Sequence, residues 1–126
     1  MPKQSVTTPL VATPTNPFSL AIKAKGFLFV SGQVGKDTRG KVVAGGFGAQ
    51  VRQSMENLKA IVTAAGSTMD DIVKLTIYVT DISKIGELNV VYREYFTDPL
   101  PARATVEVKG LGLAAEVEID AIAMCD

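Results

Sequence analysis

Two segments of the chain have different hydrophobic spacings, one typical of a helix and the other typical of a strand. Between Phe47 and Ala65 the apolar residues recur at alternating steps of four and three, the spacing of an amphipathic helix. From Val73 to Thr80 apolar and polar residues alternate one by one, as in a strand with one buried face. Gly66 directly after the first segment is typical of a helix C-terminus. The pattern therefore predicts a long helix followed by a half-buried strand.

Shorter apolar runs predict the elements on the N-terminal side of this helix. The runs 19–24 and 27–31 flank Lys25-Gly26, which favours a tight hairpin. Val42-Val43 is interpreted as a third short strand. The glycine cluster 45–48 precedes the long helix and lacks the Gly-Lys-Ser/Thr of a phosphate loop, so we interpret it as a turn.

The C-terminal side is predicted to hold a second helix and two more strands. Asp81 is a candidate N-cap, and Ile85, Leu88 and Tyr92 fall on one face of a helix that ends before Pro99. Strands are expected over 102–108 and 115–123, joined as a hairpin. The order is β-β-β-α-β-α-β-β, an α+β fold with a mixed sheet of about six strands and two helices packed on one face.

The chain length and composition fit a single ordinary domain. The 126 residues are expected to form one domain over 1–126, with the proline-rich residues 1–16 as an extended N-terminal arm. Lys and Arg (13) balance Asp and Glu (13), which gives no general attraction to nucleic acid or anionic lipid. No apolar run has the length of a membrane span, and we expect a cytoplasmic protein without nucleic-acid or membrane partners.

The absence of histidine limits the chemistry that the chain can perform. Histidine is the usual general base near neutral pH and the most frequent zinc ligand, so histidine-based triads and metal sites are excluded. The one cysteine, Cys125, has no partner for an intrachain disulfide and no histidine to activate it. We expect no metal site.

The last predicted strand has two different faces. Val117, Ile119, Ala121 and Ala123 point toward the helices, while Glu116, Glu118 and Asp120 point to the helix-free face. Arg103, Thr105 and Glu107 alternate in the preceding strand and are assigned to the same helix-free face. This polar face is either solvated or a subunit interface.

Two residues in these strands are candidates for chemistry. Arg103 follows Pro101 and could bind a carboxylate with two parallel hydrogen bonds, although a surface salt bridge is the simpler alternative. Glu118 has acidic neighbours two residues away on both sides and flanking apolar residues, which would raise its pKa and suit proton transfer through water. The strand register separates the two side chains within one chain, so a site that uses both would join two subunits. Ser31-Gly32 ends the second hairpin strand, where glycine allows close approach of a ligand.

Several sequence stretches in the same order resemble the Rid family of reactive-intermediate deaminases, also called YjgF-type proteins. The resemblance covers about 17–123. The matching stretches are Pro17-Phe-Ser19, Phe29-Val-Ser-Gly-Gln33, 53–60 with Glu56-Asn-Leu-Lys59, 73–81, Asn89-Val-Val-Tyr92, Pro101-Ala-Arg-Ala-Thr-Val-Glu-Val108 and Val117-Glu-Ile-Asp-Ala-Ile-Ala123.

This resemblance implies a fold, an assembly and a reaction. The fold would be chorismate-mutase-like, assembled as a homotrimer with three clefts between subunits. The reaction would be the hydrolysis of enamine and imine acids, such as 2-aminoacrylate and 2-iminobutanoate, to 2-keto acids and ammonia, without a cofactor. A non-catalytic trimer that binds metabolites or a partner protein in the same clefts is the alternative.

The resemblance also assigns roles to residues. Arg103 matches the arginine that holds the substrate carboxylate, and Glu118 matches the glutamate that assists water attack and proton transfer. Ser31 with Gly32 matches a cleft segment, and Asn89 a polar residue near the pocket. Two further substrate-binding positions depart from the pattern of many members: Phe18 stands in place of tyrosine, and Thr105 in place of cysteine.

Overall fold

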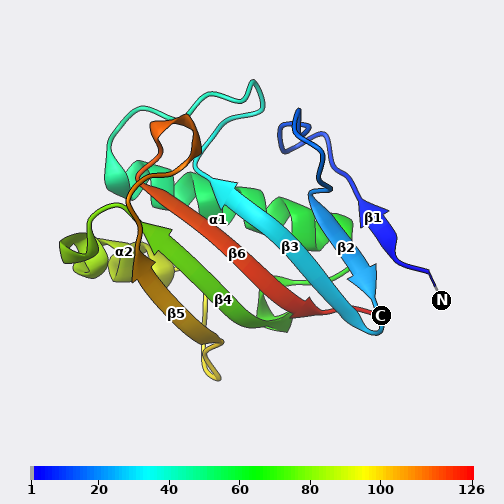
Figure 1. Ribbon diagram of the computed structural model, residues 1–126. Coiled ribbons are helices and arrows are strands. Elements are labelled where there is room, and N and C mark those ends of the chain that lie inside the picture. Colours follow the sequence, from blue (N-terminus) through cyan, green and yellow to red (C-terminus); the bar gives the residue numbers. More distant parts are fainter. Residues whose placement is uncertain (1) are drawn as a thin grey trace.

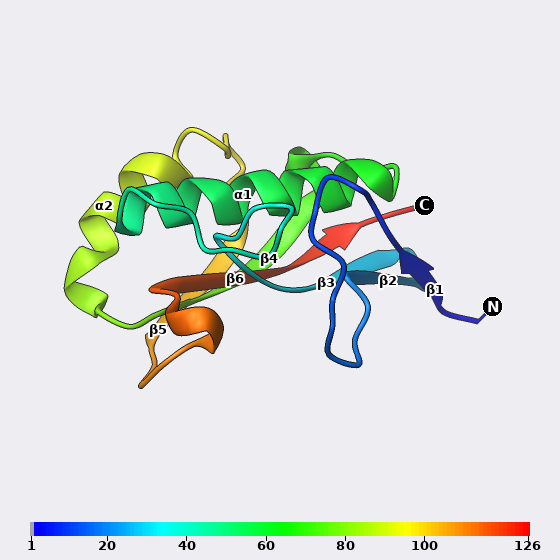
Figure 2. The same cartoon turned by 90° about the horizontal axis from the view of Figure 1, so that it is seen from above.

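Within residues 2–126, which the computed structural model describes, two helices lie on one face of a six-stranded sheet and none on the other (Figures 1 and 2). The strands are β1 (Gln4–Val6), β2 (Ala21–Ala24), β3 (Phe27–Val34), β4 (Ile72–Val79), β5 (Ala102–Glu107) and β6 (Val117–Met124). The helices are α1 (Phe47–Ala64) and α2 (Ile85–Tyr92), and short 3-10 turns lie at η1 (Met69–Asp71), η2 (Ile82–Lys84) and η3 (Gly112–Ala114). The predicted α+β class, with two helices on one face of a mixed sheet, is confirmed.

The core lies between α1 and the sheet. Val51, Met55, Leu58 and Val62 of α1 are fully buried, and so are the alternate residues Leu75 and Ile77 of β4 and Val117 and Ile119 of β6. Gly66 follows the helix with φ +88°, a left-handed conformation that favours glycine, and Ser67 donates its backbone N–H to the carbonyl of Val62. The hydrophobic spacing therefore places α1 and β4 correctly.

The strand order is β1-β2-β3-β6-β4-β5, and the predicted hairpin between the last two strands is wrong. β6 is antiparallel to both β3 and β4, whereas β5 pairs with β4 in parallel, so β4 lies between β5 and β6. Val108 donates to the carbonyl of Val79, and Thr80 donates to the carbonyl of Glu116. The connection between β5 and β6 therefore crosses the end of β4.

The third strand of the N-terminal half is not the one that the sequence predicted. Val42 forms an isolated bridge with Lys36 instead of a strand. The segment expected to be an arm contains β1, which pairs with β2 in the register Gln4↔Lys23. Val6 and Val11 of this segment are buried in the core. Three strands precede α1, as predicted, but only because the unpredicted β1 takes the place of the strand expected at Val42-Val43.

The second helix is shorter than its apolar pattern suggested. Asp81 accepts a hydrogen bond from the backbone N–H of Ser83 and so caps η2, which leads directly into α2. α2 ends at Tyr92, and Phe96 beyond it is still buried, with its ring centroid 4.7 Å from that of Tyr92.

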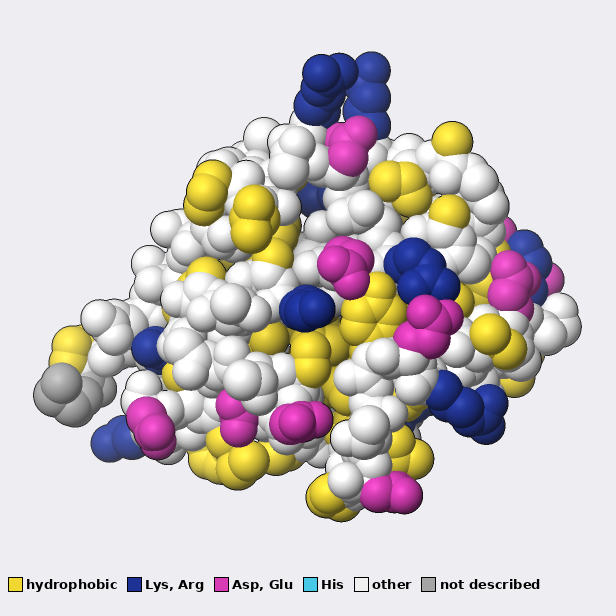
Figure 3. Space-filling model, turned by 180° about the vertical axis from the view of Figure 1, so that it is seen from behind, with side chains coloured by type: hydrophobic (Ala, Val, Ile, Leu, Met, Phe, Trp, Pro, Cys, Tyr) yellow, Lys and Arg dark blue, Asp and Glu magenta, His cyan; other side chains and the backbone are white. Residues whose placement is uncertain are grey.

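The helix-covered side shows basic and acidic side chains interspersed with apolar ones (Figure 3).

The helix-free face, which we call the open face, is only partly polar. Glu118 pairs with Tyr78, and Asp120 pairs with Thr76, on this side of the sheet. Large apolar side chains also point there and are 41–49% exposed: Phe27, Phe29, Val106 and Met124. The segments that connect β1 to β2 and β5 to β6 extend past the sheet on the same side (Figure 2).

Arg103, Thr105 and Glu107 do not lie on the open face, and this prediction is wrong. Arg103 pairs with Leu75 and Thr105 pairs with Ile77, and both partners are buried on the helix side. Residues paired in register point to the same side of a sheet. β5 is an edge strand whose residues are exposed or half-buried on both faces, so its alternation carries no information on which face is covered.

Candidate active site

Three side chains of the same chain contact the guanidinium of Arg103. Its Nε donates to Oγ1 of Thr105 at 2.8 Å, and its Nη1 donates to Oδ1 of Asn89 on α2 at 2.8 Å. Its guanidinium carbon lies 4.7 Å from the centroid of the Tyr92 ring, a cation–π distance. A guanidinium has five N–H donors, so three remain: one on Nη1 and both on Nη2. The geometry leaves the Nη1–Nη2 end available for a carboxylate.

Arg103 also lines a pocket. It has a volume of about 370 Å³ and is lined by Asn89, Tyr92, Arg93, Leu100, Pro101 and Arg103. Pro101 lies two residues before Arg103, and Leu100 is 56% exposed. The pocket combines two cationic side chains with apolar walls, which suits a small organic anion.

Glu118 lies on the open face against the β3 backbone. Gly32 stands beside its carboxylate so closely that a Cβ at that position would overlap Oε2 of Glu118. The strand pairing of β3 with β6 shifts register between Val30 and Gln33, so Gly32 lies in an irregular part of the strand. Glycine is the residue that allows this approach.

The surroundings of Glu118 disfavour its charged form. Partial burial raises the pKa of Glu118 above its usual range, the Asp120 carboxylate raises it further, and the Lys36 ammonium opposes both effects. Tyr78, the register partner of Glu118, donates its hydroxyl to Oδ2 of Asp120 at 3.1 Å. A carboxyl with a raised pKa can exchange a proton with water near neutral pH.

Ser31 and Phe18 belong to the Glu118 side of the molecule. Ser31 donates its hydroxyl to the carbonyl of Ser19 at 2.6 Å, and its N–H donates to the carbonyl of Leu20. Phe18, one residue before Ser19, is 48% exposed in the segment that leads into β2. The hydroxyl of Ser31 therefore fixes the chain next to Phe18.

Arg103 and Glu118 are far apart within one chain. In the sheet register Arg103 lies opposite Leu75, and Leu75 lies opposite Ala121, which is three residues from Glu118. Two strand spacings and three residues along a strand separate their Cα atoms by about 14 Å. The two side chains also point to opposite faces of the sheet. The expectation that they do not meet within one subunit is confirmed, although β4 and not a hairpin separates them.

The predicted site residues thus form two groups. One contains Arg103, Asn89 and Thr105, and the other contains Glu118, Gly32 and Ser31 with Phe18 nearby. The sequence placed Tyr92 on the apolar face of the second helix, and its side chain is buried in the core, but the pattern did not reveal that its ring also lies against the Arg103 guanidinium. The signal was available, because Asn89 and Tyr92 are three residues apart and share a helix face.

Comparison with known proteins identifies the family. A family model described as Endoribonuclease L-PSP matches residues 10–125. The chain belongs to this family. A "RutC family protein" of Aquifex aeolicus is 46% identical over 123 residues, which cover 96% of this chain and 98% of that protein. A relative from Dermatophagoides farinae named "2-iminobutanoate/2-iminopropanoate deaminase" is 36% identical over 126 residues, 99% of this chain and 98% of that protein.

Solved structures of this family share the fold over nearly the whole chain. A protein of the conserved Rid family from Yersinia pestis has a TM-score of 0.94 at 38% identity, over 98% of this chain and 99% of that one. E. coli TdcF with bound serine has a TM-score of 0.89 at 32% identity, over 98% and 99%. The resemblance to the Rid family is confirmed.

The cellular location stays a prediction. A Schizosaccharomyces pombe relative, 38% identical over 128 residues that cover 97% of this chain and 78% of that protein, is named as mitochondrial. Within residues 2–126, no helix is both long and apolar enough to cross a membrane.

Proposed function

We propose that the protein hydrolyses small enamine and imine acids to 2-keto acids and ammonia in clefts between the subunits of a homotrimer. The observation that carries this proposal is the guanidinium of Arg103, which is held by Thr105 and Asn89, keeps three free N–H donors and lines a pocket of about 370 Å³. Relatives named as 2-iminobutanoate/2-iminopropanoate deaminases support the choice of substrate class.

Arg103 binds the substrate carboxylate in this proposal. The Nη1–Nη2 end donates two parallel hydrogen bonds, and the charge of the guanidinium strengthens both. Thr105 and Asn89 accept hydrogen bonds from the other N–H groups, so the guanidinium is fixed before the substrate arrives. A side chain that is already ordered loses little conformational entropy on binding.

Glu118 transfers protons between the substrate and water. An enamine first becomes an iminium by protonation at carbon, and the iminium carbon accepts a water molecule. The added water loses a proton and the nitrogen gains one. Ammonia then leaves as the remaining hydroxyl loses its proton and becomes the carbonyl. Since the substrate is already electrophilic, one positioned water and one proton-transfer group suffice.

The assembly follows from the separation of the two groups. A substrate that contacts both must lie between two chains, because Arg103 and Glu118 of one chain are on opposite faces and about 14 Å apart at their Cα atoms. The exposed apolar residues of the open face are suited to subunit contact. Light scattering should give a mass of about 40 kDa, three times 13.3 kDa.

The test couples the protein to a threonine or serine dehydratase and follows release of the keto acid. Acceleration by the protein is expected, and Arg103→Ala should remove most of it. A wild-type protein without effect on the rate, or an Arg103→Ala variant as fast as wild type, contradicts the proposal.

A binding module without turnover is the second candidate. TdcF carries bound serine in its solved structure, which favours a cleft that accepts amino-acid-like ligands. Calorimetry that detects keto-acid or serine binding in a protein that never accelerates imine hydrolysis would select this candidate. For either function, the balanced charge leads us to expect no nucleic-acid partner.

A further inference from the structure

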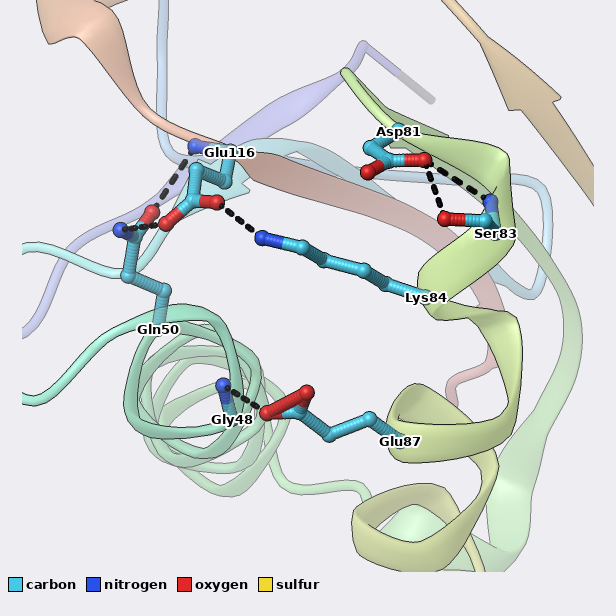
Figure 4. Close-up of polar contacts among 7 residues, drawn as sticks. All are labelled: Gly48, Gln50, Asp81, Ser83, Lys84, Glu87 and Glu116. Atoms are coloured by element: carbon cyan, nitrogen blue, oxygen red, sulfur yellow. Dashed lines mark hydrogen bonds and ion pairs between the residues drawn. The ribbon is translucent and has the colours of Figure 1, made fainter.

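Gln50 in the first turns of α1 makes a double contact with the residue that precedes β6. Its Oε1 accepts the backbone N–H of Glu116 at 2.9 Å, and its Nε2 donates to Oε2 of the same glutamate at 3.1 Å. Lys84 donates to the other carboxylate oxygen at 2.8 Å (Figure 4). Gln50 is 7% exposed, so these bonds satisfy a buried amide. The backbone and the side chain of Glu116 are both fixed by α1.

The same residue contacts the end of β3. Gly35 follows β3 and lies against the Gln50 backbone, where any Cβ would overlap the Gln50 carbonyl. Val34, the preceding residue, is the register partner of Glu118. The N-terminal end of α1 therefore seats on β3 one residue from the strand pair that contains Glu118.

Gln50 thus contacts the chain next to both β6 and β3. Its side-chain contact with Glu116 lies two residues before Glu118, and its backbone contact with Gly35 lies three residues beyond Gly32, which stands beside the Glu118 carboxylate. Gly32 lies in the irregular part of the strand pair, where the ladder alone fixes its distance from Glu118 less strictly.

We propose that Gln50 is a positioning residue whose side chain sets the placement of the Glu118 carboxylate by holding the start of β6 against α1. The inference rests on the proposed function, in which Glu118 transfers protons. Gln50 lies outside the Arg103 pocket, whose lining comes from α2 and 100–103. A change at Gln50 therefore acts on proton transfer and leaves carboxylate binding intact.

The experiment compares Gln50→Leu with the control Arg52→Leu. Both substitutions replace a polar side chain of α1 by leucine, but Arg52 pairs with Glu94 on the exposed side of the helix and not with Glu116. A misplacement of about 1 Å can cost up to about 100-fold in rate. We expect kcat for imine hydrolysis to fall about 10- to 100-fold in Gln50→Leu with KM within about twofold, and the control to keep the wild-type values.

A second measurement does not need turnover. Titration of the Glu118 carboxyl by 13C NMR, with Glu118→Gln used for assignment, should show its pKa moving from the raised value toward the ordinary one in Gln50→Leu, since a displaced carboxyl is better solvated. The control should titrate as wild type. If the wild type shows no turnover, the proposed function fails and this titration alone decides the inference.

Three results overturn the proposal: an unchanged titration with unchanged kcat, a rise in KM with kcat intact, or equal losses in Gln50→Leu and the control. Should Gln50→Leu fail to fold, Gln50→Glu replaces it, because it keeps the acceptor for the Glu116 N–H and turns the second contact into a repulsion between carboxylates. The same fall in kcat is expected there, and wild-type kinetics and titration in Gln50→Glu would equally overturn the proposal.

Discussion

Replacing Arg103 by lysine tests the geometry of the proposed carboxylate site while the positive charge is kept. Lysine can donate to a carboxylate as a point charge but cannot present two parallel N–H groups, and it loses the bonds to Thr105 and Asn89. The substitution therefore removes both the pair of parallel N–H donors and the hydrogen bonds that hold them in place.

The expected loss follows from the number of bonds. A hydrogen bond to a charged group contributes about 1.5 to 3 kcal/mol, and we assign the loss of the bidentate pair about 2 to 3 kcal/mol because lysine recovers one contact. At about 1.4 kcal/mol for each factor of ten, kcat/KM should fall about 30- to 140-fold, mainly through KM.

The assay measures keto-acid release at several substrate concentrations, with 2-iminobutanoate and with an imine that lacks the carboxylate. Arg52→Lys is the matched control, because Arg52 makes a bidentate pair with Glu94 on the exposed side of α1. The reasoning is refuted if Arg103→Lys keeps the wild-type kcat/KM, or if the uncharged imine loses as much as the acid.

Four further predictions concern Glu118 and the assembly. Gly32→Ala should lower kcat at least about tenfold while the thermal midpoint moves little, because the added methyl meets the flexible end of Glu118; an unchanged kcat would show that the contact is irrelevant. Lys36→Met should raise the pKa of Glu118 further and Asp120→Asn should lower it, so pH–rate profiles of the two variants should shift in opposite directions. Since folding favours protonated Glu118, the free energy of unfolding should decline as pH rises from the ordinary glutamate pKa through the raised one, and urea titrations of Glu118→Gln should lack this decline. Phe29→Glu, at an exposed position of the open face, should reduce the mass measured by light scattering from about 40 to about 13 kDa with the circular dichroism spectrum retained; a trimer in this variant would place the interface elsewhere.

Elements with two unlike faces could be predicted from the sequence, and elements without them could not. α1 and β4 each bury one face completely, so their spacing follows the core. β1 has three residues, of which Gln4 and Ser5 are exposed, and it is held in the sheet by backbone pairing with β2. Backbone pairing leaves no trace in the side-chain pattern, so this strand was missed.

The candidate site shows the same division. Arg103 and Glu118 could be singled out as residues, and their separation within one chain could be anticipated from the length of the strands. Their faces could not, because β5 lies at the sheet edge and the insertion of β4 beside it depends on long-range pairing. The supports of Arg103 come from α2, which is distant in sequence, so only the folded chain reveals Tyr92 beneath the guanidinium.

The opposite orientation of Arg103 and Glu118 makes the proposed activity recoverable by mixing two inactive proteins. Arg103→Ala supplies an intact glutamate and Glu118→Gln an intact arginine, so a cleft between the two kinds of subunit can contain both groups. After dissociation and random reassembly of equal amounts, about one cleft in four would be complete, since each of its two groups is intact with a probability of about one half. Complementation of this kind would not occur in a site built within a single chain.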